Sequence, residues 1–409
     1  MEGGLIALPA NIDLCGFILK CGINMVIRIC FVTFDERIKS IGAESLSEKD
    51  FQAQINKIST EKIEVARILQ NFNNRSINLG KISWLPKKVS FSLTILSNLP
   101  YLIKQDIFVM SSIFSRISLI TCLFCKLCGK KSMITIHGFY DEEWLKLGYS
   151  KLYIICRNFL ANINLKIVDM VIVNDVKLEE KLISKINCNL LVRELFVDTK
   201  KFSRNTINVE KLLEIKSAYN ITDKYILFIG YLDEWDGILD LLSVFKIIHD
   251  ELPEYKCVIV GGERIDKKLI RYKIDAFLNT NNLNDSIIFT GRVDHDIIKY
   301  FLYGAHITIL PMHPPQAGVG RIILESLSME IPIITYNIGV LNQVVIDNET
   351  GFCVQLGNLS LMSSKAIFLL KNPDIREKFG SAGRMIVQSR YSLNEYMHNW
   401  MNSIKLLNT

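Results

Sequence analysis

Two glycines, an arginine and a glutamate lie close together near residue 320 of this 409-residue chain, and they have the types and spacing to bind a phosphorylated ligand. Gly318 and Gly320 precede a segment of helical spacing that begins at Arg321 and contains Glu325. A glycine-rich turn that opens a helix presents free N–H groups and the positive end of the helix dipole to an anion. An arginine at the same place adds a charge-assisted hydrogen bond. We therefore expect an anion-binding site here rather than a plain tight turn.

A histidine is a second candidate for chemistry, in the N-terminal half. His137 directly follows residues 132–136, an apolar run with the composition of a strand, and precedes a glycine. A lone histidine is usually structural. Ligands of parallel α/β sheets, however, bind at the carboxyl ends of strands. We therefore interpret His137 as a candidate catalytic residue, and the acidic residues 141–143 that follow as the start of a helix.

Two further motifs contain metal-ligating residue types, and both have a structural alternative. Cys122, Cys125 and Cys128 have CxxCxxC spacing, but they fall in or beside a run predicted to be helical, where cysteine packs as a small apolar residue. Asp294 and Asp296 form a DxD pattern around a histidine, and Asp294 is better interpreted as a helix N-cap. We predict neither a metal nor a cofactor.

The elements that would position these residues form a regular series. Short apolar strands in the C-terminal half mostly end in Gly or Pro and alternate with helical patterns; they span residues 225–230, 256–261, 286–291, 307–311 and 332–335. Strands of this kind, separated by helices, indicate a parallel sheet covered on both faces. The N-terminal half repeats the pattern more loosely, with strands at 27–34, 107–110, 132–136 and 168–173 and a charged helix across 45–72.

The fold class that follows is α/β, with two doubly wound Rossmann-like domains, because the chain is too long for one ordinary core. We expect an N-terminal extension at 1–24, which is not native if Met25 is the true start. The N-terminal domain then spans 25–205 and the C-terminal domain 206–390. The last helix, at 391–409, is expected to pack back on the N-terminal domain.

Composition narrows the class of protein. The net charge of +6 is too weak to imply a nucleic-acid partner. Between residues 81 and 131, however, eight basic residues accompany a single acid, which suits either an anionic membrane face or an ordinary solvated surface. Ten cysteines without regular spacing and no convincing secretory signal favour the cytoplasm. Neither a Walker-type phosphate loop nor a dinucleotide-binding GxGxxG motif follows a strand.

A string of motifs in the C-terminal half resembles, in order, the GT-B glycosyltransferases of the large retaining family 4. They are FIGYLDEWDG (228–237), VIVGGE (258–263), FTGRVDHDII (289–298), AGVGRIILESLSMEIPIIT (317–335) and NETGFCV (348–354). TIHG (135–138) and VDTKKF (197–202) are weaker matches in the N-terminal half. Each motif alone is weak, but their order and spacing together favour this fold.

The resemblance implies a GT-B architecture with a nucleotide-sugar donor in the C-terminal domain and an acceptor entering from the N-terminal domain. Glu325 resembles the glutamate that accepts hydrogen bonds from the donor ribose, and Gly230, Gly318 and Gly320 would line the donor site. The loop of His137 resembles one that faces the cleft. The acceptor would be a glycan or a lipid-linked molecule of surface polysaccharide or glycolipid synthesis, reached at the inner face of the membrane.

The chain departs from the family pattern where the donor phosphates would bind. The family's arginine and lysine fall on Tyr231 and Asp236, and two of its glutamates fall on Ala317 and Gln343. A missing arginine removes a charge-assisted phosphate contact. Either Arg321 and Arg292 supply the positive charge instead, with Arg321 the stronger candidate, or the protein is a binding or regulatory partner without efficient turnover. A nucleotide-sugar epimerase on the same fold is a third alternative.

Overall fold

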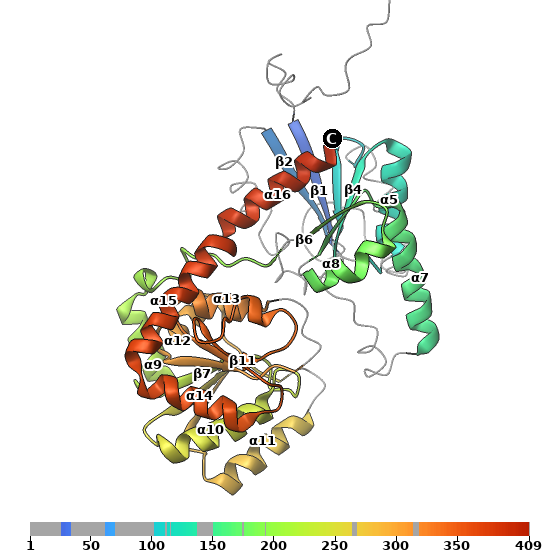
Figure 1. Ribbon diagram of the computed structural model, residues 1–409. Helices are drawn as coiled ribbons and strands as arrows, with labels where there is room; N and C mark the ends of the chain where they lie inside the picture. The colour runs from blue at the N-terminus through green and yellow to red at the C-terminus, as the bar shows by residue number, and fades with distance from the viewer. Residues whose placement is uncertain are drawn as a thin grey trace, which may run out of the picture.

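Two parallel sheets organise the protein, each in its own half of the chain (Figure 1). The computed structural model describes residues 26–33, 62–69, 102–110, 113–114, 116–136, 150–173, 176–192, 194–263, 268–313 and 319–408. Within these residues every strand pair is parallel, as expected for apolar strands alternating with helices.

The N-terminal sheet has the strand order β2-β1-β3-β4-β5-β6. Its strands are β1 (Val26–Thr33), β2 (Lys62–Leu69), β3 (Ile107–Met110), β4 (Lys131–Ile136), β5 (Met170–Val173) and β6 (Asn189–Val192). The helices described with it are α5 (Arg116–Cys128), α7 (Lys151–Ile167) and α8 (Val176–Leu182), which the short helix η3 (Ile183–Lys185) extends.

The C-terminal sheet has the order β12-β11-β10-β7-β8-β9. Its strands are β7 (Tyr225–Ile229), β8 (Lys256–Val260), β9 (Ile287–Gly291), β10 (Ile307–Leu310), β11 (Ile333–Tyr336) and β12 (Gly351–Val354). The chain builds outward from β7 to β9 and then crosses back to place β10 beside β7. Ligands of such sheets bind outside the carboxyl ends of the strands at this kind of reversal, here β7 and β10.

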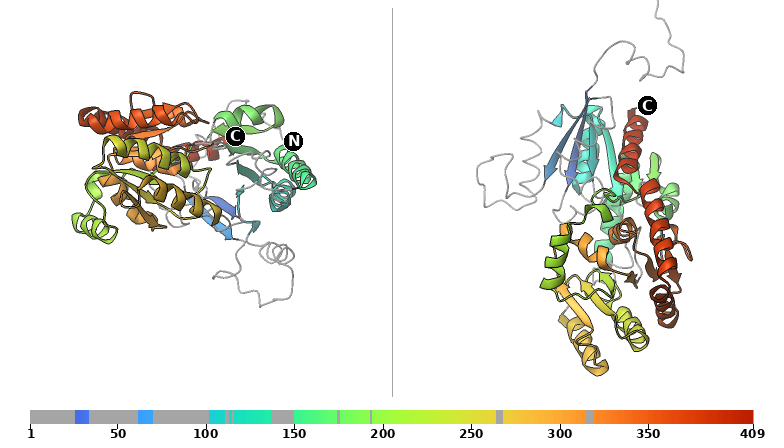
Figure 2. Two further views of the ribbon diagram at one scale, coloured as in Figure 1. Left: turned by 90° about the horizontal axis from the view of Figure 1, so that it is seen from below. Right: turned by 90° about the vertical axis from the view of Figure 1, so that its left-hand side faces the viewer.

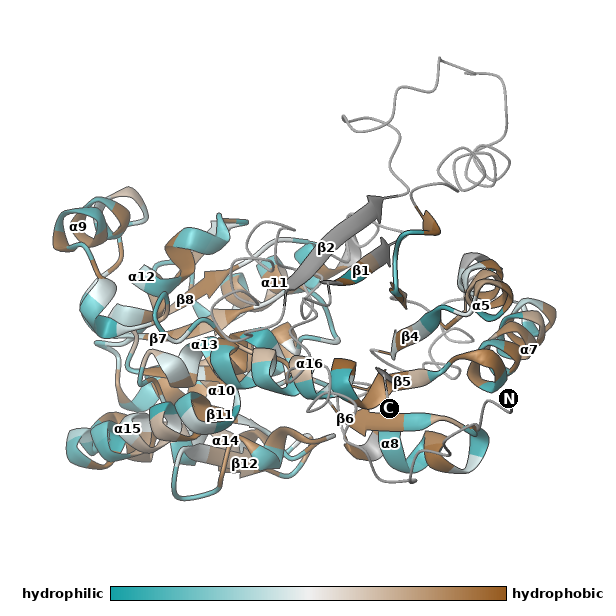
Figure 3. Ribbon diagram, turned by 90° about the horizontal axis from the view of Figure 1, so that it is seen from above, coloured by the Kyte–Doolittle hydropathy of each residue, from teal (hydrophilic) through white to brown (hydrophobic). Residues whose placement is uncertain are grey.

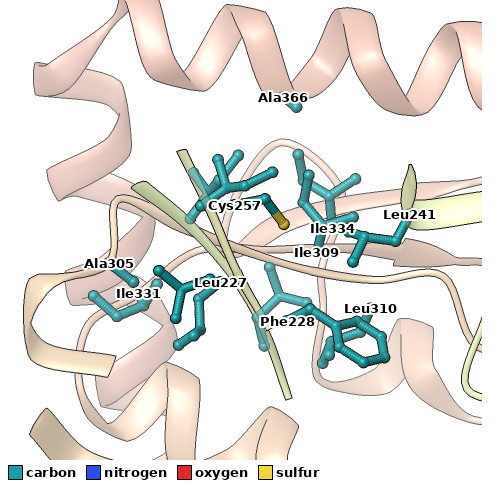
Figure 4. Packing of buried hydrophobic residues seen from close by; sticks show 14 of the residues in the cluster. Leu227, Phe228, Leu241, Cys257, Ala305, Ile309, Leu310, Ile331, Ile334 and Ala366 are labelled. Atoms are coloured by element: carbon teal, nitrogen blue, oxygen red, sulfur yellow. The ribbon is translucent and has the colours of Figure 1, made fainter. Parts of the chain in front are cut away.

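Helices enclose this second sheet and bury its core. They are α9 (Val209–Ala218), α10 (Ile238–Glu251), α11 (Lys268–Asn281), α12 (Ile298–Gly304), α13 (Arg321–Ser328), α14 (Leu359–Lys371) and α15 (Pro373–Arg390), with the short helices η4 (Arg204–Thr206), η5 (His295–Ile297) and η6 (Leu341–Gln343). Figure 4 shows Cys257, Ile309 and Ile334 packed on one side of the strands, and Leu227 on the other side near Ile331 and Ala305. Burial of this kind is the main stabilising term.

The last helix, α16 (Leu393–Asn408), leaves the C-terminal domain and packs on the N-terminal sheet (Figures 1 and 2). Trp400, Met397 and Ile404 are buried in one cluster with Ile29 of β1 and Met133 of β4. Its amphipathic pattern explains this position, because the apolar stripe must be covered by another element. The chain therefore passes between the domains twice.

The two passages lie beside one another. Residue Val197 pairs with Ser392 in an isolated parallel bridge. The Arg390 guanidinium donates two hydrogen bonds, of 2.8 and 2.6 Å, to the Glu194 carboxylate. A bidentate pair of this type fixes orientation as well as distance.

One expected element was wrong. Residues 62–69 were expected within a charged helix, but they form β2, which pairs with β1 along all eight of its residues. The order Lys62-Ile63-Glu64-Val65 alternates polar and apolar residues, which is the period of a strand at the edge of a sheet. The charge of the surrounding segment masked that short alternation.

The cysteine-rich run forms helix α5, as the sequence predicts. Cys122 and Cys125 are buried in the apolar cluster between α5 and the sheet, whereas Cys128 is exposed at the end of the helix. Burial raises the pKa of the Cys122 thiol to about 12 and raises that of Cys125 as well. The thiolate form that metals bind is therefore disfavoured at these two positions. None of the described helices is both long and apolar enough to cross a lipid bilayer.

We predict that Trp400→Ala destabilises the N-terminal domain by about 3–5 kcal/mol, because it removes a fully buried indole from the contact between α16 and the sheet. Leu406→Ala, at a site 47% exposed on the same helix, is the control and should change stability little. Urea unfolding followed by circular dichroism measures both. Equal stability of the two variants would contradict this account of α16.

Candidate functional site

Within the described residues, no side chain caps the amino end of α13. Its N-cap, Gly320, has extended backbone dihedrals and provides no side-chain hydrogen bond. A methyl group built at Gly320 would meet nothing within 4 Å. The first N–H groups of a helix find no partners within it, so they require acceptors from outside. Gly318 lies outside the described residues.

Glu325, one turn into α13, is buried at 2% exposure and is hydrogen-bonded to a histidine. The distance from its Oε1 to His295 Nε2 is 2.6 Å. The imidazole also lies against the Phe202 ring, with centroids 5.4 Å apart. A carboxylate buried away from water requires a hydrogen-bond partner, and His295 provides one. His295 thus fixes one oxygen of Glu325.

Sequence analysis missed this role of His295. The residue is the centre of the DxD pattern in η5, immediately after β9, and it meets α13 thirty positions later in the chain. The sequence could have suggested His295 as a site residue, because it lies just beyond the carboxyl end of a predicted strand. Asp294 does stand at the N-cap of η5, as expected, but its side chain makes no capping hydrogen bond there. Asp296 forms an ion pair with Lys201, at 2.5 Å.

Arg321 is the cation at the start of α13, and it is half-buried. Burial lowers the pKa of its guanidinium, whereas the neighbouring Glu325 carboxylate acts in the opposite direction. An arginine remains charged at neutral pH despite such a shift. A half-buried cation at a helix start that no described side chain caps concentrates positive potential at that place.

The loops after β7 and β8 contact each other closely. Gly261 has a φ of +142°, and a methyl group there would lie 1.8 Å from the Gly230 carbonyl oxygen. Only glycine fits this position. Arg292, just after β9, lies with its guanidinium carbon 5.5 Å from the centroid of the Tyr231 ring and donates a 3.0 Å hydrogen bond to the Glu263 carbonyl oxygen. The structure therefore brings Arg292, Tyr231 and Gly230 together.

A carboxylate occupies the β7 loop where the resemblance implies a lysine. Asp236 Oδ2 accepts a hydrogen bond of 2.6 Å from the backbone N–H of Tyr231. A methyl group at Gly237 would lie 1.8 Å from the Pro311 carbonyl oxygen, so this loop also packs against the segment after β10. The N–H of Tyr231 thus has an acidic partner within its own loop. The negative charge of Asp236 would repel a phosphate group at this position.

Contacts between the loops form a continuous series along the carboxyl edge of the sheet. The β7 loop meets the β9 loop through Tyr231 and Arg292, the β9 loop meets α13 through His295 and Glu325, and the β10 segment meets the β7 loop at Gly237. The predicted site residues of the C-terminal domain that are described therefore belong to one continuous edge. His137 lies outside the described residues, as does Ala317.

A second polar cluster, also missed by sequence analysis, lies on the same edge. Asp240, in the first turn of α10, accepts a 2.6 Å hydrogen bond from the Tyr336 hydroxyl, and its Oδ2 lies 2.9 Å from His313 Nε2. Burial, together with Asp240, raises the pKa of the Tyr336 hydroxyl, which therefore stays protonated as a donor. His313 lies three residues beyond the end of β10. No group of three or more metal-ligating side chains occurs within the described residues.

Comparison with known proteins shows which proteins the chain resembles in sequence. Residues 211–385 match the family model described as "Glycosyl transferases group 1". A protein of Staphylococcus aureus called capsular polysaccharide biosynthesis glycosyltransferase CapM is 26% identical over 225 residues, which are 53% of this chain and 57% of that protein. The chain spans about half the length of the curated relatives it matches.

Solved structures cover nearly the whole chain. A glycosyltransferase from Rickettsia africae superposes with a TM-score of 0.71 at 20% identity, covering 94% of this chain and 99% of that one. Anabaena HepE in complex with UDP superposes with a TM-score of 0.69 at 12% identity, covering 92% and 99%. The predicted fold, two Rossmann-like domains of the GT-B type, is confirmed.

We predict that Asp236→Asn strengthens binding of a nucleoside diphosphate about fivefold, because removal of one repelling charge is worth about 1 kcal/mol at a solvated site. The amide oxygen can still accept from the Tyr231 N–H, so the loop should keep its shape. Calorimetric titration with UDP measures the effect. Asp250→Asn, at an exposed position further along α10, is the control. Weaker binding by Asp236→Asn would contradict this view of the loop.

We also predict that His295→Ala lowers the stability of the C-terminal domain by about 1–3 kcal/mol, because the buried Glu325 carboxylate loses its hydrogen-bond partner. Adding Glu325→Gln should restore part of the loss, since a neutral amide is less costly to bury. His398→Ala, on the exposed side of α16, is the control. Chemical unfolding measures all of these variants. A His295→Ala variant as stable as the control would show that the pair contributes nothing.

Proposed function

We propose, since residues 211–385 match the model of the group 1 glycosyltransferases, that this protein transfers a sugar from a nucleotide-sugar donor to an acceptor with retention of anomeric configuration. One observation supports this most directly. The uncapped amino end of α13 combines Arg321 and Glu325 at the carboxyl edge of the sheet, beside the reversal of strand order. That arrangement suits a ligand with both a diphosphate and hydroxyl groups.

The diphosphate and the ribose of the donor would contact different residues of α13. The diphosphate would accept hydrogen bonds from the first N–H groups of α13 and from Arg321, with Gly318 and Gly320 allowing close approach. The ribose hydroxyls would donate to the Glu325 oxygen that His295 leaves available. Arg292, held over Tyr231 near Gly230, would add positive potential from the β9 loop. UDP is the first nucleotide to test, because structural neighbours contain it.

The chemical step would need no protein nucleophile. The acceptor hydroxyl oxygen forms a bond to the anomeric carbon on the face from which the diphosphate leaves, and the bond to the diphosphate oxygen breaks. The acceptor proton passes to the departing diphosphate. Catalysis then rests on positioning and on stabilisation of charge that develops on the leaving group. His137 is proposed to contact the donor sugar or the acceptor from the N-terminal domain.

The acceptor proposed is a glycan or a lipid-linked molecule of surface polysaccharide or glycolipid synthesis. The CapM relative, named for capsular polysaccharide biosynthesis, supports this class. A lipid-linked acceptor requires contact with a membrane, so the proposal includes a cytoplasmic protein that associates with the inner, anionic face.

A second candidate function is a binding or regulatory subunit with the same fold. Tyr231 and Asp236 motivate it, because neither supplies the positive charge that the family pattern has there. The two candidates differ in turnover. Only the first predicts release of a nucleoside diphosphate in the presence of donor and acceptor.

We predict that Arg321→Ala lowers the rate of transfer, or of donor hydrolysis, about 100- to 1000-fold, as loss of one contact to developing charge typically does. Arg321→Lys should retain part of the rate, since it keeps the charge without the planar fork. Arg271→Ala, at a surface ion pair of α11, is the control. Release of nucleoside diphosphate from labelled donors measures the rate. If wild-type protein binds donors but releases none, the binding subunit becomes the better description.

A further inference from the structure

Helix α7 exposes apolar side chains where a surface helix normally exposes polar ones. Leu152, Ile155 and Phe159 are 71%, 64% and 64% exposed, and their spacing of three and four places them on one face. The opposite face packs inward through Ile154 and Ala161. The helix thus has apolar residues on both faces over its first turns.

Helix α5 shows the same feature. Ile120, Leu123 and Leu127 are 43%, 47% and 87% exposed, again with spacing of three and four, while Cys122 and Cys125 face inward. The two helices pack side by side at the outer edge of the N-terminal domain, and both carry brown, hydrophobic segments (Figure 3). We call these six residues the α5–α7 face.

The described segments that carry the α5–α7 face are rich in basic residues. The described segments 116–136 and 150–168 contain seven basic residues and no acidic one; the basic residues are Arg116, Lys126, Lys130, Lys131, Lys151, Arg157 and Lys166. Neighbouring Asp169 and Asp106 pair with Lys126 and Lys130. Apolar side chains within a cationic surround match the boundary of an anionic bilayer, where headgroups attract the cations and acyl chains accept the apolar tips.

We propose that the α5–α7 face docks the protein on an anionic lipid surface. Two helices bearing exposed Leu, Ile and Phe at one edge are suited to shallow insertion into the headgroup boundary rather than to spanning. A protein partner would need a complementary acidic surface, whereas anionic lipid supplies negative charge without specific geometry. The proposal does not depend on glycosyl transfer, because it rests on exposure and charge alone.

The position of the face leaves the candidate donor site accessible. In Figures 1 and 3 the helices α5 and α7 lie on the side of the N-terminal domain away from the C-terminal domain. The carboxyl edge of the C-terminal sheet, with α13, belongs to the other domain. Docking through α5 and α7 therefore places the N-terminal domain against the lipid while a soluble donor can still reach the other.

The test is co-sedimentation of the full chain with vesicles. Wild-type protein, the variant Leu127→Ser/Phe159→Ser, and the control variant Leu213→Ser/Met385→Ser are compared. The control removes apolar residues of similar exposure, 60% and 64%, from the C-terminal domain. One set of vesicles contains about 30% phosphatidylglycerol in phosphatidylcholine, a composition at which basic clusters gain measurably from lipid charge, and the other contains phosphatidylcholine only.

The proposal predicts that wild type and control bind the anionic vesicles at least about tenfold more strongly than neutral ones, with binding weakened by salt, and that Leu127→Ser/Phe159→Ser loses at least about tenfold. Unchanged unfolding midpoints exclude misfolding, because the altered side chains are exposed. Equal binding by variant and control overturns the proposal. So does a wild-type dimer in light scattering that the variant alone abolishes, since the face would then pair two copies of this chain.

Discussion

The open amino end of α13 is the constraint on which the candidate site depends. The first N–H groups of a helix require outside acceptors, and no side chain of the described residues caps this one. The helix itself is fixed, because Ile323, Leu324 and Leu327 are buried in the core of the C-terminal domain. The buried helix therefore holds its amino end at the carboxyl edge of the sheet, where the described residues provide no side-chain cap. Arg321 adds a full positive charge there, and Glu325 provides a hydrogen-bond acceptor one turn deeper.

The departures from the family pattern have a consistent electrostatic meaning. The β7 loop has an acid, Asp236, whose carboxylate binds the loop's own N–H group, so that loop offers little to a phosphate. Positive charge is instead found on α13 and on the β9 loop, at Arg321 and Arg292. His295 ties these parts together through Glu325 and contacts Phe202 in the segment between the domains. The positive charge available to a phosphate therefore lies on α13 and the β9 loop rather than on the β7 loop.

Much of the fold could be predicted from the sequence, because buried parallel strands are continuous apolar runs with glycine at their ends. The strand at 107–110 and the helix from residue 321 were placed closely for that reason. The strand β2 was not, since a short alternation lay within a charged segment. The pairs His295–Glu325 and Tyr336–Asp240 could not be predicted either, because each joins residues that only the folded sheet brings together. Exposure of Phe159 or Leu127 likewise depends on which face a helix turns inward.

The most direct test of the central claim is a crystal structure of the protein with the nucleoside diphosphate that stabilises it most in a thermal screen. The account predicts phosphate oxygens within about 3 Å of the first N–H groups of α13, with the Arg321 guanidinium on the same phosphates. Phosphates bound instead in the β7 loop, or a side chain of the protein capping α13 in the complex, would contradict it.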